Sequence, residues 1–82
     1  MQKHRSPIPG NIRRYRRFRG MTQKALASRL AIDPATLSKY EHGQTKVPAE
    51  VLVTIAHILR VPLTTLTEPA EADALPVTTA AE

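Results

Sequence analysis

Apolar residues along the chain recur at intervals of three and four positions, which is the spacing of helices that bury one face. Four stretches follow this spacing, at residues 11–19, 23–30, 34–42 and 49–59, and a short fifth element lies around residues 63–66. The alternating pattern of a half-buried strand is absent from the sequence. The pattern therefore predicts an all-α fold, a compact bundle of about five short helices.

Residues that start and stop helices stand at the ends of these stretches. Thr22 and Asp33 have side chains that accept hydrogen bonds from the first turn of a helix, and Pro34 suits the first helical position. Gly20 and Gly43 stand where helices commonly end. We therefore expect separate helices joined by short turns.

The inward faces of these helices predict the core of the protein. The expected core residues are Ile12, Tyr15, Leu26, Ala27, Leu30, Leu37, Tyr40, Leu52, Ile55, Ala56 and Leu59, and the short element around residues 63–66 is expected to close the core with Val61. Phe18 falls on the opposite face of its helix and is expected to be exposed.

Composition divides the chain into three parts. Residues 1–10 form a basic arm whose prolines can enter a first helical turn, residues 11–66 hold the helices, and residues 67–82 are expected to be a disordered acidic tail. Residues 1–66 carry all twelve Lys and Arg but only three acidic residues, a formal charge of +9, whereas residues 67–82 carry a charge of −4. A basic body suggests a polyanionic partner such as nucleic acid.

The second and third predicted helices are separated by only residues 31–33, as in a helix-turn-helix, whose second helix enters the major groove of DNA. The outward face of this helix holds Ala35, Ser38, Lys39 and His42. Lys39 can donate to guanine, Ser38 can donate or accept, and the Ala35 methyl can contact a thymine methyl. An ordinary solvent-exposed helix face would have the same composition, so this face alone does not identify a DNA-binding helix.

Several motifs support the interpretation as a helix-turn-helix. The sequence contains Thr-Gln-x-x-Leu-Ala at residues 22–27, Glu-x-Gly at 41–43, Pro48, Ile-Ala at 55–56 and Val-Pro-Leu at 61–63. With these motifs, residues 11–66 resemble the lambda-repressor-like helix-turn-helix family, also called the Cro/cI or XRE family. The first two motifs are specific when they occur together at this spacing.

The resemblance implies roles for individual residues. The expected DNA-binding residues are Gln23, Pro34, Ala35, Thr36, Ser38, Lys39, His42, Gln44, Thr45 and Lys46. Gln23 would bind a phosphate and brace the recognition helix, the residues of 34–39 would face base edges, and those of 42–46 would contact phosphates. Arg16 would pair with Glu41, and helical periodicity independently places both on inward faces, where a half-buried arginine needs a carboxylate.

The chain departs from the family pattern at several positions. Ala31 and Arg60 stand where the family favours glycine, and a left-handed conformation at Ala31 would cost about 1–2 kcal/mol. Pro34 and Ala35 stand where many members carry glutamine or another long polar residue. Specificity is therefore expected to depend on Thr36, Ser38 and Lys39 and on DNA shape.

Catalysis and cofactor binding have no support in the sequence. The three histidines lack metal-ligand spacing, and no acid–base cluster or catalytic triad is recognisable, so we expect no enzyme, no catalytic residue, no cofactor and no metal site. The sequence has no cysteine, no apolar run of roughly 20 residues and no signal-peptide stretch. We expect no membrane partner and a cytoplasmic location of bacterial or phage type, on the nucleoid when DNA is bound.

The resulting hypothesis is a small transcription regulator, expected to be a repressor, that binds double-stranded DNA through residues 34–42. It would bind as a homodimer on an inverted repeat, with the dimer contact near residues 61–66 and the start of the tail, and Phe18 as a second candidate. The alternative is an antitoxin-type protein whose main partner is another protein bound through the tail. No feature of the sequence distinguishes repression from activation or identifies the operator.

Overall fold

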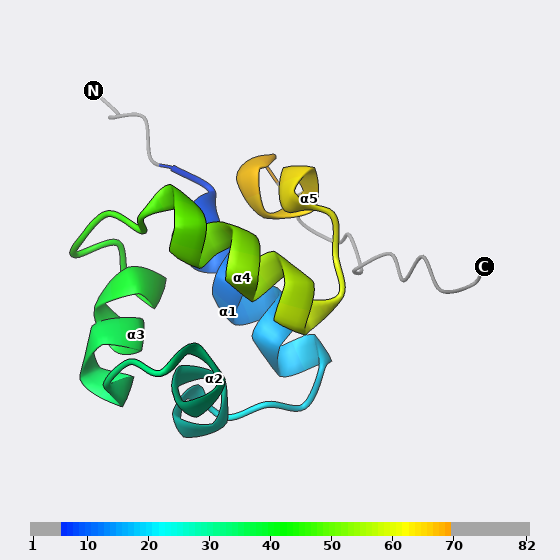
Figure 1. Cartoon of the computed structure of the whole chain (residues 1–82). Helices are drawn as coiled ribbons and strands as arrows, with labels where there is room; N and C mark the ends of the chain where they lie inside the picture. The colour runs from blue at the N-terminus through cyan, green and yellow to red at the C-terminus, as the bar shows by residue number, and fades with distance from the viewer. Residues whose placement is uncertain (1–5, 70–82) are drawn as a thin grey trace.

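The computed structural model describes residues 6–69, which fold into five helices without a strand, as the hydrophobic pattern predicted. The helices are α1 (Ile8–Phe18), α2 (Gln23–Leu30), α3 (Pro34–Glu41), α4 (Ala49–Leu59) and α5 (Leu63–Thr67). α1 and α4 pass through the centre of the molecule, with α2 and α3 toward one side and α5 toward the other (Figure 1). Residues 1–5 of the expected arm and 70–82 of the expected tail lie outside the described residues.

α2 and α3 begin at the N-cap residues that the sequence predicted. The Thr22 hydroxyl accepts from the backbone N–H of Ala25 at 3.0 Å, and the Asp33 carboxylate accepts from the N–H of Ala35 at 2.8 Å. α1 begins at Ile8, earlier than the predicted start at residue 11. The reason is that prolines in the first turn of a helix lose no hydrogen bond, so this part of the expected arm continues into the helix.

The core agrees with the inward faces of the predicted helices, with one difference. The fully buried side chains of largest volume are Ile12, Leu26, Leu37, Ile55, Leu59 and Leu66. Leu30, expected in the core, is only half-buried because it is the last residue of α2 and packs against the edge of the core. Phe18 is 44% exposed, as expected.

α2 and α4 both end in a residue with left-handed backbone. Ala31 has φ 59° and Arg60 has φ 61°. Both residues, which stand where the family favours glycine, therefore adopt the left-handed conformation that is unfavourable for a residue with a Cβ atom. In each turn the next N–H bonds back to the helix, from Ile32 to the carbonyl of Ala27 and from Val61 to the carbonyl of Ala56, both at 3.0 Å. The geometry is that of a Schellman motif, which normally favours glycine.

Two polar side chains, one in α1 and one directly after it, cap the ends of later helices. Asn11, 3% exposed, donates its side-chain amide to the carbonyls of Leu66 at 2.9 Å and Glu68 at 2.8 Å, at the end of α5. Arg19 donates to the carbonyl of Leu59 at 2.7 Å, at the end of α4. Because terminal carbonyls of a helix have no partner within it, these bonds fix α4 and α5 against α1.

Candidate nucleic-acid interface

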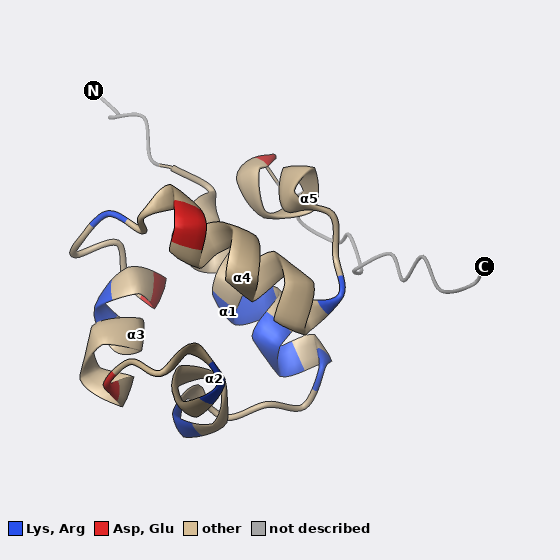
Figure 2. Cartoon of the chain, viewed as in Figure 1, with Lys and Arg blue, Asp and Glu red and all other residues tan. Residues whose placement is uncertain are grey.

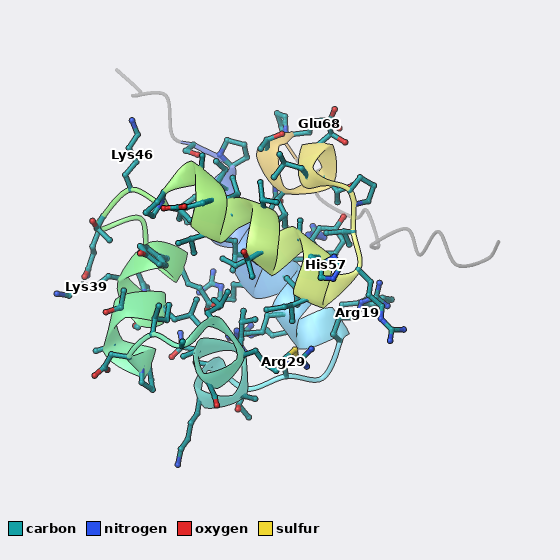
Figure 3. The ribbon with its side chains drawn as sticks, viewed as in Figure 1. Arg19, Arg29, Lys39, Lys46, His57 and Glu68 are labelled. Carbon is teal, nitrogen blue, oxygen red and sulfur yellow. The ribbon has the colours of Figure 1, made fainter. Side chains whose placement is uncertain are left out.

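α3 lies at one side of the molecule with one face buried and the other open to solvent (Figure 1). Leu37, Tyr40 and Glu41 are buried against the core. The predicted base-facing residues divide by exposure: Pro34, Ala35 and Lys39 are exposed, and Thr36 and Ser38 are half-buried. Lys39 extends away from the body of the protein, as does Lys46 in the loop after α3 (Figure 3).

A buried polar network holds α3 from behind. Arg16 donates to the Glu41 carboxylate twice, from Nε at 2.6 Å and from Nη2 at 3.0 Å, and its Nη1 donates to the carbonyl of Met21 at 2.7 Å. Gln23 donates to the same carboxylate at 3.0 Å. The network joins α1, the start of α2 and the end of α3, and every buried side-chain nitrogen and oxygen among the described residues has a partner. Such a fully paired carboxylate fixes α3 without an orphaned charge.

Gln23 therefore sits where a bracing residue must sit, half-buried against Glu41. Its contact with a DNA phosphate stays a prediction. Ser38 and His42 contact each other along α3: the His42 Nδ1 lies 2.8 Å from the Ser38 carbonyl and 3.4 Å from the Ser38 hydroxyl. Because a carbonyl only accepts, His42 Nδ1 must carry the proton that it donates there.

The loop between α3 and α4 has a cleft on each side. The first, of about 690 Å³, is lined by Thr36, Lys39, Tyr40, Gln44, Thr45, Lys46 and Pro48. This cleft brings together five residues that the sequence predicted to bind DNA. The second, of about 970 Å³, lies between the loop and the start of α1 and includes Arg13 with Lys46. Arg13 was not among the predicted contacts; only its position on the flank of its helix could have indicated it.

Charge of both signs lies around α3 and the loop after it (Figure 2). Lys39 and Lys46 lie on α3 and its loop, Asp33 and Glu41 stand at the two ends of α3, and Glu50 lies in the first turn of α4. Glu41 is neutralised by its buried partner Arg16, which leaves Asp33 as the exposed carboxylate of this helix. A region of this kind attracts a polyanion through its lysines.

Residues 6–69 contain no group of three His, Cys, Asp or Glu that could hold a metal ion. Within the same residues, no helix is long and apolar enough to span a membrane.

Comparison with known proteins relates residues 11–68 to a family model described as a helix-turn-helix domain. The clp gene regulator ClgR from Corynebacterium glutamicum is 26% identical to the chain in two crystal structures. One covers 74% of this chain and 65% of ClgR with a TM-score of 0.71, and the other covers 80% and 86% with a TM-score of 0.72. The chain thus spans about two thirds of ClgR in the first structure. No curated protein sequence matches the chain.

Two further solved structures place this fold in different settings. The biofilm regulator SinR, in complex with DNA, is 27% identical over 72% of this chain and 95% of that one, with a TM-score of 0.66. HppE, in its FeII form with substrate, is 30% identical over 83% of this chain, with a TM-score of 0.71, but this chain corresponds to only 40% of it. The fold therefore occurs both in a DNA-bound regulator and as a part of a larger protein.

Proposed function

This chain belongs to the XRE-type helix-turn-helix family, and we propose that it is a small transcription regulator that binds double-stranded DNA with α3 in the major groove. The observation that carries the proposal is the two-sided construction of α3. Its inner side is fixed by the Arg16–Glu41 pair, and its outer side presents Lys39 to solvent. A groove-reading helix needs both a fixed position and exposed side chains that can reach base edges.

In this proposal the phosphate contacts come from the start of α2 and from the loop after α3. Gln23 at the start of α2 would bind one phosphate, and the loop residues His42, Gln44, Thr45 and Lys46 would bind others. The four loop residues are all exposed, and three of them line the cleft beside Lys39. The cleft supports the proposal because exposed amides and lysines around a groove-bound helix fix its register on the duplex. A regulator bound in this way would act as a repressor by occupying the site that other proteins need.

We further propose that the protein binds as a homodimer on an inverted repeat, with half-sites about 10 base pairs apart. Of the expected contact region, Val61 and Leu66 are buried within the monomer and cannot serve a partner. The exposed large apolar residues of the described chain are Phe18, Val53 and Leu63, and the last two lie on α4 and α5, which pack together. These two helices are therefore the better candidate for the dimer contact. The mass of the protein–DNA complex tests the dimer itself: one chain per binding site would exclude a homodimer.

Selection of bound sites from random double-stranded DNA tests the function itself. The expected result is enrichment of a symmetric sequence that the wild-type protein binds specifically. Lys39→Ala should weaken binding to this site by roughly 5- to 150-fold and relax the preference at one base pair. Arg29→Ala is the control, because Arg29 is an exposed basic residue on the side of α2 away from α3 (Figure 3). No enrichment, or equal losses for both variants, would contradict the proposal.

A further inference from the structure

The cleft between the loop after α3 and the start of α1 collects positive charge from two elements. Arg13 lines it from α1, and Lys46 lines it from the loop. Glu41 also lines this cleft, but its side chain is 0% exposed and is paired with Arg16. Among the described residues, no exposed carboxylate therefore opposes the two cations, and the cleft is suited to an anion.

Arg13 differs from the other half-buried or buried arginines near it. Its side chain is half-buried, yet its guanidinium has no hydrogen-bond or ion-pair partner within residues 6–69. By contrast, Arg16 donates to the carboxylate of Glu41, and Arg19 donates to the carbonyl of Leu59. A guanidinium has five N–H donors and no acceptor, and its planar fork matches a carboxylate or a phosphate. At this cleft the donors of Arg13 are available to such a group.

The walls of the cleft are close together and adjoin the recognition helix. Gly43 directly follows the C-cap of α3, and a Cβ atom placed on it would lie 3.6 Å from Pro9 Cγ in α1. Lys46 lines this cleft and also the neighbouring cleft that contains Lys39. The cations Lys39, Lys46 and Arg13 therefore follow one another from α3, over the loop, to α1.

We propose that Arg13 and Lys46 together bind a backbone phosphate of DNA in this cleft. A DNA strand at the edge of the major groove carries one phosphate per nucleotide, so a strand that passes Lys39 and crosses the loop next meets Arg13. Such a contact fixes the register of α3 on the duplex and carries no sequence information. The inference rests on the proposed function, because it requires α3 to lie in the major groove, and it adds α1 to the elements that bind DNA.

The salt dependence of DNA binding measures this contact. Arg13→Gln removes the charge, and Arg17→Gln is the matched control, because Arg17 is an exposed arginine one turn further along α1 that lines neither cleft. Loss of one phosphate contact reduces the slope of log K against log salt by about 0.9, which corresponds to about fivefold weaker binding at about 0.15 M salt and about fifteenfold at about 0.05 M. We expect these losses for Arg13→Gln on every sequence variant of the site. Arg17→Gln should keep the wild-type affinity and slope.

Two further variants of the experiment separate a phosphate contact from a structural role. Thermal unfolding of Arg13→Gln should match the wild type, because the side chain has no partner to lose, and Arg13→Lys should recover the salt slope. Methylphosphonate linkages, which are uncharged, locate the contact when each phosphate of the half-site is replaced in turn. At one position the replacement should weaken the wild type about fivefold but weaken Arg13→Gln much less.

The outcomes separate this inference from the proposed function. If the wild-type protein binds no double-stranded DNA, both are wrong. If it binds a site that Lys39→Ala weakens, yet Arg13→Gln and Arg17→Gln have the same affinity and slope, only the inference on Arg13 is wrong. It is also wrong if every methylphosphonate weakens Arg13→Gln as much as the wild type. Binding of inorganic phosphate that Arg13→Gln abolishes, with no effect of this variant on DNA binding, would make the cleft a site for a free anion and overturn the inference.

Discussion

Replacing Glu41 by alanine should be among the most damaging single changes in this protein. Glu41 is 3% exposed, and its carboxylate accepts three hydrogen bonds, two from Arg16 and one from Gln23. Arg16 is 7% exposed, and removal of the Glu41 carboxylate leaves its guanidinium with only the carbonyl of Met21 as a partner. Breaking a buried ion pair in this way typically costs about 3–5 kcal/mol of unfolding free energy. That is a large part of the about 5–15 kcal/mol that holds a whole domain together.

Thermal and denaturant unfolding, followed by circular dichroism, measure this loss. For a domain of this size, each kcal/mol shifts the midpoint of thermal unfolding by about 4–8 °C, so Glu41→Ala should lower it by about 12 °C or more. Glu50→Ala is the matched control, because Glu50 is an exposed glutamate in the first turn of α4. Its loss should cost no more than about 1 kcal/mol.

A double variant distinguishes the cost of an orphaned charge from the loss of packing. Arg16→Met combined with Glu41→Leu removes both charges and keeps most of the volume, and replacement of a buried pair by apolar residues is often close to neutral. We therefore expect the double variant to be more stable than Glu41→Ala. The reasoning is refuted if Glu41→Ala melts within about 1 kcal/mol of the wild type, or if the double variant is no more stable than the single one.

The other predictions concern the helix ends and the DNA contact. Ala31→Gly and Arg60→Gly should each raise the unfolding free energy by about 0.5–1 kcal/mol, because glycine relieves the left-handed strain at a smaller entropic cost; a decrease would contradict this. Asn11→Ala should lower it by about 1–3 kcal/mol through the uncapped carbonyls of α5, and hydrogen exchange should then show α5 opening first. DNA affinity should fall linearly with salt on logarithmic axes, and Lys46→Ala should reduce that slope by about one; an unchanged slope would remove Lys46 from the phosphate contacts.

Much of the fold could be predicted because its signals are local. The caps Thr22 and Asp33 and the glycine after α3 each act within one turn of their helix, so they can be located without knowing the rest of the structure. The inward faces of the helices follow from helical periodicity, which alone placed both Arg16 and Glu41 on the inward faces of their helices. The left-handed backbone of Ala31 was indicated only by the family resemblance, because the family favours glycine at this position.

What could not be predicted depends on contacts between distant parts of the chain. Asn11 caps a helix 55 residues away, and a single asparagine in a sequence carries no mark of that partner. Arg13 faces the loop after α3 only because α1 and α3 pack together. The predicted DNA contacts are a different case: the structure brings five of them around one cleft, but their contacts to bases and phosphates remain predictions, because the ligand that defines them is a second molecule.

The position of α3 and the surface that it presents are controlled by separate residues. Its position depends on Glu41, which is bound from behind by Arg16 and Gln23, and on α1, which also caps α4 and α5. None of these bonds involves Pro34, Ala35 or Lys39. Substitutions at the exposed residues therefore change what is recognised at little cost to the fold. This independence explains how Pro34 and Ala35 can stand at the start of α3 while the buried bonds that hold the helix in place are kept.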